Sequence, residues 1–407
     1  MSELRRGESL WLDAREVDPV RAPALRGQHR AEVVIVGGGI TGCAVAHQLA
    51  SAGTRVVLIE AARIGRGSTA ASTALLMQEP DADFGDLAGR YGVSGARQIW
   101  NASRGAVQGL IRALKSLSGA PQAESRPSIY FTRRDEHVPA LKKELDARHR
   151  AGIRVEWLTA ERLRRVAGLT AAAGILTRGD AQVDPYAACM AFARGAQRAG
   201  ARLHEHTRAH TIRQRHGGVE VDTGRARISA PHVVIATGYA TPEFRPLAGR
   251  FRLSDTYVVA TPRLDRRARA AIGLREVMLW DTERPYHYAR WTHDHRLLFG
   301  GHDQPHKRKT TPATVDRRIS ALLDERHELF PAGRQVGCEY AWEGLFATTP
   351  DGLPYIGRHR HYPRHLFALG YGGNGMTFGF LAAQIIARMV QGKALPADTL
   401  FRFGRLR

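Results

Sequence analysis

The sequence predicts an α/β protein, and three of its stretches predict it. Residues 32–60 read as strand, glycine-rich turn, helix and strand, which is the pattern of a nucleotide-binding βαβ unit. Residues 251–334 instead alternate short strands with turns, as an antiparallel sheet does. A second glycine-rich turn, at residues 372–375, opens another helix. We therefore expect a Rossmann-like domain joined to a second domain built on an antiparallel sheet plus helices.

Each residue type in the first unit has a physical role. Val33–Val36 is a β-branched run that suits a strand buried on both faces. Gly37 permits a tight turn, Gly39 lets the backbone approach a pyrophosphate, and Gly42 lets the helix pack closely on the strand. Free N–H groups and the dipole at the helix start stabilise phosphates, and Glu60 can accept hydrogen bonds from a ribose. These parts in register predict a dinucleotide site.

Length, cysteines and hydropathy set the class of protein. A chain of 407 residues can bury a large core, and we expect two domains. Cys43, Cys189 and Cys338 are scattered with no CxxC, which is typical of a reducing compartment and argues against disulfides or structural zinc. The N-terminus carries acids and no long apolar core, and no window reaches the roughly 20 apolar residues of a membrane helix. The sequence predicts a cytoplasmic protein with no transmembrane segment.

The formal net charge of +21 is unusual for an enzyme. It is compatible with a polyanion such as RNA, an anionic membrane surface or an acidic substrate. The basic residues are nearly all arginine, and pairs such as Arg164-Arg165 and Arg266-Arg267 never grow into a long basic tract. A codon bias toward arginine explains this as well as a partner would, and we favour that explanation.

The segment at residues 61–79 follows the second strand and is rich in small and hydroxylated residues. Its backbone can run against a cofactor while hydroxyl groups donate to phosphate or ring oxygens; the alternative is a polar connection with an N-cap at Ser72. Further along, we expect helices at 83–118 and 138–151 and one that starts at Asp184-Pro185. Strands are expected at 128–132, 202–212 and 232–238, with a hairpin around 219–224. The strands at 202–212 and 232–238 and the hairpin are expected to extend the first sheet.

The antiparallel region is expected to contain strands at 257–260, 277–280, 286–291 and 296–299 and a helix at 315–329. Alternation along 286–291 places Tyr286, Tyr288 and Arg290 on one face. An aromatic floor beside an arginine could hold a substrate, although a solvated sheet face would look the same. The histidines of this region form no coherent ligand set with nearby acids, so no metal site is predicted.

The C-terminal block adds the second glycine-rich turn after strands at 354–357 and 366–370, followed by a helix that runs to about residue 390. A flavin gains negative charge around N1 and the C2 carbonyl when it is reduced. Backbone N–H groups and a helix dipole at that position would stabilise this charge, and a nicotinamide has no comparable need. The two turns together therefore favour a flavin nucleotide.

Five motifs carry a family resemblance: the βαβ unit, STAASTALL at 68–76, ATG at 236–238, TPDGLPYIG at 349–357 and GYGGNG at 370–375. In this order they resemble the D-amino-acid-oxidase-like flavoprotein superfamily, and most of all its sarcosine, glycine and γ-glutamylputrescine oxidase branch. The resemblance implies a glutathione-reductase-type FAD-binding domain whose flavin ring faces the antiparallel sheet. It also implies oxidation of a C–N bond of a small amine or amino acid by hydride transfer to flavin N5, followed by hydrolysis of the imine.

The same resemblance implies where FAD binds. The first turn would face the pyrophosphate, Glu60 the ribose, the backbone of Ala209 the adenine, and residues 373–376 the pyrimidine end of the flavin. Residues 1–245 and 336–407 would form the FAD-binding domain, and residues 246–335 the substrate domain with a contribution from 120–160. The predicted FAD-binding residues are Gly37, Gly38, Gly39, Ile40, Thr41, Gly42, Glu60, Ala61, Ser68, Thr69, Ser72, Thr73, Ala209, Ala236, Thr237, Gly238, Gly372, Gly373, Asn374, Gly375 and Met376.

Three departures from the family pattern qualify this picture. The cysteine that attaches flavin in sarcosine oxidases falls at about Gly344, and Cys338 is too far upstream, so we expect non-covalent FAD. Leu298 stands where those enzymes carry an oxygen-activating lysine, so the electron acceptor is O2 or an unidentified carrier. The arginine that holds the substrate carboxylate after Trp-x-Gly is missing. Either Arg290 replaces it, or the substrate is an amine without an α-carboxylate whose ammonium meets Glu343.

In such enzymes the cofactor performs the redox chemistry and the protein supplies orientation and electrostatics. We therefore expect Tyr288 and Arg290 as substrate contacts and Trp342 as a wall beside the flavin. Two alternatives are a flavoenzyme that acts on an aminomethyl group of modified RNA, and an FAD-binding subunit of a dehydrogenase complex. The first predicts a contiguous basic face around the flavin entrance, and the second an exposed apolar patch.

Overall fold

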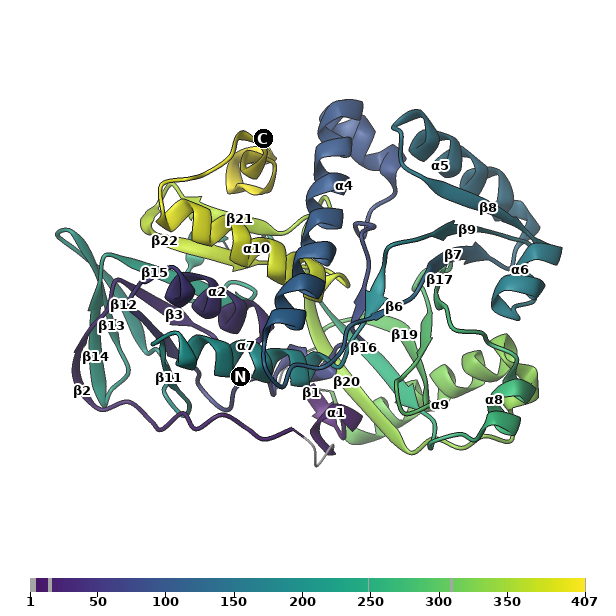
Figure 1. Ribbon diagram of the computed structural model, residues 1–407, viewed down its shortest axis with the longest axis horizontal. Coiled ribbons are helices and arrows are strands. Elements are labelled where there is room, and N and C mark those ends of the chain that lie inside the picture. Colours follow the sequence, from purple (N-terminus) through teal and green to yellow (C-terminus); the bar gives the residue numbers. More distant parts are fainter. Residues whose placement is uncertain (1–4, 14–16, 248, 308–309, 407) are drawn as a thin grey trace.

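A computed structural model describes residues 5–13, 17–247, 249–307 and 310–406 of the chain. The strands of this part form four sheets. In Figure 1 the six- and four-stranded sheets lie on the left and the nine-stranded sheet on the right, with the long helix α4 (Phe84–Ser116) between them. The protein therefore has the mixed α/β architecture that the sequence predicts.

The six-stranded sheet carries the predicted nucleotide-binding unit. Its four central strands and one edge strand run parallel, and the other edge strand, β21, is antiparallel. All residues of β4 are buried, as a β-branched strand covered on both faces should be. In spatial order its strands are β11 (Arg202–His204), β4 (Val56–Ile59), β3 (Val33–Val36), β15 (His232–Gly238), β22 (Tyr362–Leu369) and β21 (Tyr355–His359).

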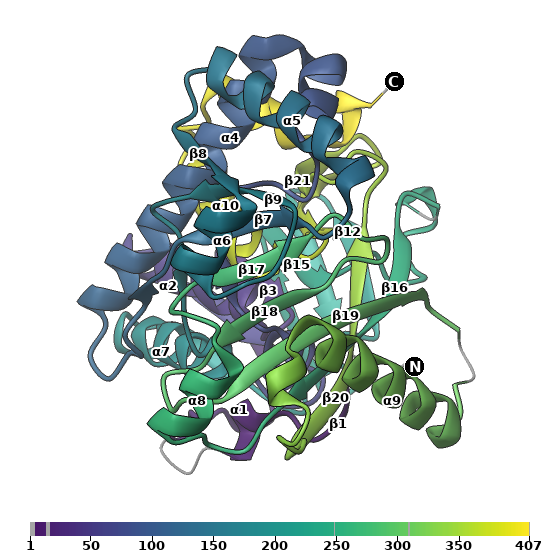
Figure 2. The ribbon, with the colours of Figure 1, turned by 90° about the vertical axis from the view of Figure 1, so that its right-hand side faces the viewer.

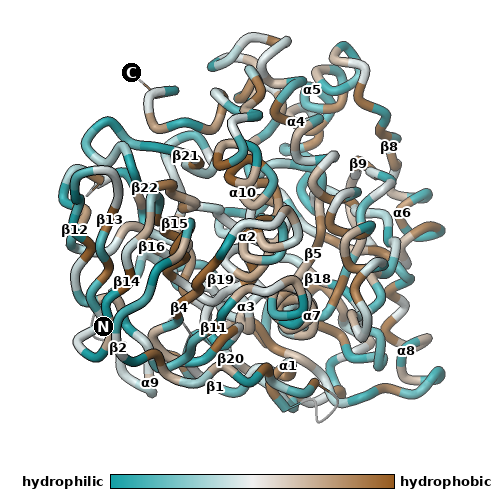
Figure 3. The backbone as a smooth tube through the Cα atoms, turned by 60° about the vertical axis from the view of Figure 1, so that its left-hand side comes forward, coloured by the Kyte–Doolittle hydropathy of each residue, from teal (hydrophilic) through white to brown (hydrophobic). Residues whose placement is uncertain are grey.

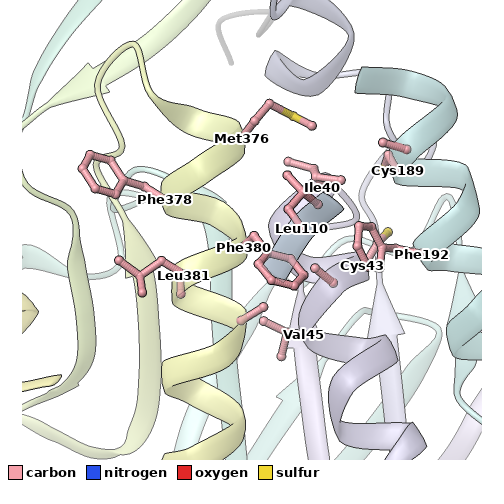
Figure 4. Close-up of a cluster of buried hydrophobic side chains, with 14 of the residues drawn as sticks. Ile40, Cys43, Val45, Leu110, Cys189, Phe192, Met376, Phe378, Phe380 and Leu381 are labelled. Atoms are coloured by element: carbon pink, nitrogen blue, oxygen red, sulfur yellow. The ribbon is translucent and has the colours of Figure 1, made fainter. Parts of the chain in front are cut away.

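Three helices pack against this sheet, α2 (Ile40–Ser51), α7 (Pro185–Arg198) and α10 (Gly375–Val390), and α4 packs on α10 and α7. Figure 4 shows Ile40 and Val45 of α2 meeting Leu110 of α4, Phe192 of α7 and Phe380 of α10. Because β3 and β22 are parallel to the strand between them, the glycine turns that follow β3 and β22 lie at the same edge of the sheet. That edge is where open α/β sheets bind their ligands.

Two expectations about this half are wrong. The hairpin around 219–224 exists, but with β2 (Gly27–Arg30) it forms a separate four-stranded sheet of β12 (Thr211–Arg215), β13 (Gly218–Asp222) and β14 (Ala226–Ala230). The expected strand at 202–212 is interrupted after β11. There His206 takes a φ of 49° and the N–H of Thr207 donates to the carbonyl of Glu60 at 2.8 Å, so the chain turns toward β4.

The nine-stranded sheet forms the other half. It is antiparallel throughout except where β17 pairs parallel to β7. Figure 2 shows helices α8 (Arg266–Ile272) and α9 (Pro312–Leu329) in front of its strands. Its strands in order are β1 (Arg5–Gly7), β20 (Tyr340–Thr348), β16 (Arg252–Ala260), β19 (Leu297–Pro305), β18 (Tyr288–Trp291), β17 (Met278–Asp281), β7 (Ser128–Thr132), β9 (Ala173–Thr177) and β8 (Val155–Thr159).

This sheet recruits strands from both sides of residues 246–335. The domain boundaries given above stay a prediction, and the sheet indicates that a substrate domain would draw on β20 as well as on residues 120–160. The remaining elements are short, apart from α5: α1 (Leu10–Asp13), α3 (Ser68–Ala71), α5 (Val138–Arg150), α6 (Ala160–Ala167), a small sheet of β5 (Leu75–Leu76), β10 (Ala181–Gln182) and β6 (Glu124–Ser125), and five 3-10 turns (Asp135–His137, Arg245–Leu247, Pro331–Gly333, Pro396–Phe401, Phe403–Arg405).

Apolar residues concentrate in the core rather than in one long helix. Figure 3 shows hydrophobic segments gathered around α10 and the strands beside it. Across the ranges that the structure describes, no helix is long and apolar enough to cross a membrane.

Candidate active site

The first glycine turn leaves no room for side chains. A Cβ on Gly42 would lie 1.9 Å from the carbonyl oxygen of Gly37, and one on Gly37, whose φ is 111°, would lie 2.5 Å from that of Ala236. Gly39 is the N-cap of α2 and brings no side chain to the helix start. The turn is therefore a bare backbone cradle at a helix N-terminus, which fits a pyrophosphate.

The acid at the end of β4 is held in place by the same turn. Glu60 accepts from the N–H of Gly38 and from that of Ala62, both at 2.8 Å, and it keeps further acceptor capacity for ribose hydroxyls. The Thr207–Glu60 hydrogen bond brings the segment that contains half-buried Ala209 beside this acid. The predicted ribose and adenine contacts thus adjoin one another, and their binding role stays a prediction.

The second glycine turn opens α10 toward the same region. Asn374 is the N-cap, but its side-chain amide donates to the carbonyl oxygens of Met77 at 3.2 Å and Glu79 at 2.8 Å instead of capping the helix. Met376 is 2% exposed and lies in the core (Figure 4), so a contact with a flavin would involve its backbone. The side chain of Asn374 therefore does not block the N-terminus of α10, where a helix dipole favours an electron-rich group.

A cavity of about 300 Å³ lies between the second glycine turn, the loop at residues 68–81 and the nine-stranded sheet. It brings together part of the predicted site: Ser68, Ser72, Thr73, Gly238, Gly372, Gly373, Asn374, Gly375 and Tyr288. Its lining also contains Asp81, Thr256, Trp280, Arg284, Tyr286 and Asp303. The predicted residues that lie outside the lining are Gly37, Gly38, Gly39, Ile40, Thr41, Gly42, Glu60, Ala61, Thr69, Ala209, Ala236, Thr237, Met376, Arg290 and Trp342.

Two aromatic rings form the sheet side of the cavity. The rings of Tyr286 and Tyr288 are 5.9 Å apart. Tyr288 lies so close to Gly300 that a Cβ there would be 2.2 Å from its ring, and the Tyr286 hydroxyl would be 2.4 Å from a Cβ on Gly373. Burial raises the pKa of both hydroxyls, and that of Tyr288 lies 3.0 Å from the Thr256 hydroxyl. Both tyrosines therefore stay neutral and offer hydroxyls and ring faces.

Two carboxylates in the cavity were not singled out from the sequence. Asp81 accepts a hydrogen bond from the N–H of Gly373, and enclosure by the surrounding chain raises its pKa to about 7, although part of its surface remains exposed to the cavity. Burial raises the pKa of Asp303 to about 6. The only sequence signal for Asp81 is its place just after the hydroxyl-rich loop, and Asp303 follows a predicted strand with no signal of its own.

Arg290 and Trp342, expected beside the substrate and the flavin, lie behind the cavity wall. The Arg290 guanidinium donates to the carbonyl of Thr73 at 2.6 Å and to that of Val183 at 2.9 Å, and is 2% exposed. Trp342 is fully buried, and its indole N–H donates to the carbonyl of Ala71 at 2.9 Å. Both side chains hold the loop that lines the cavity, and their contact with substrate or flavin stays a prediction.

The N-terminal segment adds two bonds to the same loop. The Ser9 hydroxyl donates to the carbonyl of Ala70 at 2.5 Å, and the Trp11 indole to that of Ser72 at 2.8 Å. Every carbonyl of residues 70–73 therefore accepts a hydrogen bond from a side chain elsewhere in the fold. We call this set of four bonds the loop clamp.

The loop clamp yields a prediction about flavin geometry. Trp342→Phe keeps an aromatic ring but leaves the buried Ala71 carbonyl without its donor, which costs about 1–3 kcal/mol. We expect weaker FAD binding and a changed flavin absorbance spectrum. Trp100→Phe is the matched control, because Trp100 is 1% exposed and its indole N–H makes no hydrogen bond within the described part of the chain. Equal effects of both substitutions on the spectrum would contradict the clamp.

The nucleotide cradle, the second helix N-terminus and the cavity beside that helix N-terminus are typical of a flavin-dependent redox enzyme. Comparison with known proteins agrees, because residues 32–389 match the FAD dependent oxidoreductase family (DAO), and the chain belongs to that family. Its cofactor is FAD. None of the three free cysteines lines the cavity, and a Cβ on Gly344, which does line it, would lie 2.7 Å from that of Ala71, so the attachment is non-covalent.

Several relatives share nearly the whole chain. Glycine oxidase of Bacillus licheniformis is 28% identical over 389 residues, which cover 92% of this chain and 96% of that protein. Gamma-glutamylputrescine oxidoreductase of Escherichia coli is 27% identical and covers 89% and 84%. Among solved structures, glycine oxidase from Geobacillus kaustophilus aligns with a TM-score of 0.79 at 24% identity and covers 93% and 100%. The fold is therefore that of the glycine oxidase structures.

Proposed function

We propose that this enzyme oxidises a C–N bond of a small amine or amino acid. Bound FAD would supply the hydride acceptor at flavin N5, and the imine product would be hydrolysed by water. The observation that carries the proposal is the small cavity, whose lining includes two tyrosines and the second glycine turn, which we propose holds the pyrimidine end of the flavin. The relatives support it, since they are named for glycine and γ-glutamylputrescine, both of which contain amine nitrogen.

The residues of this chain bind and orient the substrate. Tyr288 is the proposed substrate contact, because its ring and hydroxyl line the cavity. The Arg290 guanidinium is buried and donates its N–H groups to the backbone carbonyls of Thr73, Trp291 and Val183, so it is poorly placed to anchor a substrate carboxylate. Glu343 is buried and outside the lining. An amine without an α-carboxylate is therefore the better candidate.

The alternatives receive less support from the same region. Two carboxylates and one arginine in the cavity lining are unfavourable for a polyanion such as modified RNA. The large hydrophobic side chains that the described residues expose, Val93 and Leu395, lie on separate elements, whereas a dehydrogenase subunit predicts an apolar patch. We also propose a cytoplasmic location, which the free thiols suit.

The test begins with the colour of the purified protein. We expect a yellow protein that releases FAD on acid treatment and bleaches anaerobically with one or more amines or amino acids. Re-admission of air then distinguishes O2 as acceptor, which restores the colour rapidly, from a separate carrier, which leaves the flavin reduced. A protein that holds FAD but is bleached by no amine or amino acid would contradict the proposal.

A further inference from the structure

The cavity has the opposite charge to the rest of the chain. The sequence contains 60 basic residues (lysine and arginine) against 39 acidic ones. The charged side chains in the lining are nonetheless Asp81, Asp303 and Arg284. Neither aspartate forms an ion pair with any residue that the structure describes. The N–H of Gly373 bonds to Asp81, and the charges of His287 and His302 act on Asp303 without a salt bridge. In a protein so rich in arginine, two carboxylates that face one small cavity and lack an ion-pair partner indicate a cationic ligand.

The position of Asp303 is set by a bulge in β19. Between Gly301 and Gln304 this strand has one residue more than its partner strand has between Tyr257 and Asp255. Such a bulge redirects a side chain out of the regular alternation. Here it places the Asp303 carboxylate in the cavity lining.

One oxygen of this carboxylate has no partner. The Thr256 hydroxyl bonds to the Asp303 side chain. Its Oδ1 atom is buried and accepts no hydrogen bond from the described residues. Buried acceptors are rarely left unsatisfied, because their desolvation is then uncompensated. A ligand N–H group in the cavity would satisfy this atom.

The surroundings also suit a cation. Tyr286, Tyr288 and Trp280 present ring surfaces to the cavity, and aromatic faces attract ammonium groups. Trp280 is fixed by stacking on Tyr130 at 3.8 Å between ring centroids. The one cation of the lining, Arg284, is an exposed residue that donates to the carbonyl of Glu283 at 2.9 Å.

We propose that the substrate is a diamine or polyamine with no carboxylate, whose second ammonium group binds Asp303 and Asp81 between the tyrosine rings. The first amine then presents its C–N bond to the flavin. This inference rests on the proposed function and deepens it. It assigns the two aspartates as specificity residues, which contact the end of the substrate that does not react.

The first experiment compares three probes of equal carbon chain length. Putrescine ends in a second ammonium, n-butylamine in a methyl group and γ-aminobutyrate in a carboxylate. We measure anaerobic flavin bleaching at increasing concentrations of each. Putrescine is expected to reach half-saturation at a concentration at least about tenfold lower than n-butylamine, which corresponds to about 1.4 kcal/mol. γ-Aminobutyrate is expected to be the poorest.

The second experiment removes one charge at a time. Asp303→Asn keeps the side-chain volume and should raise the half-saturating putrescine concentration at least about tenfold more than that of n-butylamine. Asp81→Asn should show the same preference, together with some loss for n-butylamine, because Asp81 also accepts the N–H of Gly373. Asp146→Asn, on the exposed surface of α5, is the matched control for loss of overall negative charge. Thermal unfolding of each holoprotein checks folding. It also gives a binding readout without turnover, because putrescine should raise the midpoint of the wild type but not of Asp303→Asn.

The outcomes distinguish a failure of the diamine assignment from a failure of the proposed function. Bleaching by amino acids with no preference for putrescine leaves the proposed function standing and overturns the diamine assignment. Equal losses with putrescine and n-butylamine in Asp303→Asn also overturn it. If no amine bleaches the flavin, the proposed function fails, and an unchanged midpoint with putrescine then removes the dication site as well.

Discussion

Gly42→Ala is expected to yield a colourless protein that does not retain FAD. The new methyl group would sit 1.9 Å from the Gly37 carbonyl oxygen, so the turn and the start of α2 must move apart. The backbone N–H groups that face the pyrophosphate move with them. We expect the FAD dissociation constant to rise at least about 100-fold, or about 2.8 kcal/mol. Fluorescence titration of the apoprotein with FAD measures this.

Two further substitutions make the result specific. Gly105→Ala in α4 is the matched control, because a Cβ there meets nothing within 4 Å. It should bind FAD as the wild type does. Gly39→Ala meets only the Thr69 hydroxyl, at 3.1 Å, and should fold normally while its methyl group intrudes on the phosphate site. Full FAD affinity in a folded Gly39→Ala protein would show that this turn is not the cradle.

Arg148→Met is expected to cause the largest loss of stability. Arg148 is 1% exposed and pairs with Glu79 at 2.8 Å and Glu144 at 2.7 Å. Burial alone would lower its pKa, but the two carboxylates raise it above its usual value. Removal of the guanidinium leaves both acids buried without compensation, which costs about 3–5 kcal/mol. Urea unfolding followed by circular dichroism measures the change.

Arg148→Met should also affect the flavin site. Glu144 accepts from the N–H groups at the start of α4, and the carbonyl of Glu79 accepts from Asn374 at the second glycine turn. We therefore expect weaker FAD binding alongside the lost stability. Arg55→Met is the control, since this arginine is 79% exposed and its pair with Glu32 should contribute less than about 1 kcal/mol. Comparable losses in both proteins would refute a structural role for the buried pairs.

The parts of the fold that the sequence revealed are those set by local chemistry. The turn at residues 37–42 is confirmed in register because strand burial, glycine geometry and helix start all act within a few neighbouring residues. The prediction of one strand over 202–212 is wrong, because the chain turns where the N–H of Thr207 bonds to the carbonyl of Glu60, which is distant in the sequence. No local pattern reports such a tertiary hydrogen bond.

The site shows the same division. Tyr286 and Tyr288 were found by alternation along one strand, and both line the cavity. Asp81 and Asp303 are far apart in the sequence, and a bulge rather than regular alternation directs Asp303 into the cavity. Arg290 shares the expected strand face, yet its length carries the guanidinium past the cavity to the Thr73 carbonyl. Only the assembled sheet distinguishes these cases.

The loop clamp has a practical consequence at the beginning of the chain. Because Ser9 and Trp11 anchor carbonyls of the cavity loop, we expect the segment around these two residues to contribute to flavin binding. A bulky affinity tag fused there, or proteolytic trimming during purification, would disturb flavin retention before it disturbed folding. Preparations that lose their yellow colour should therefore be checked first for an intact amino terminus.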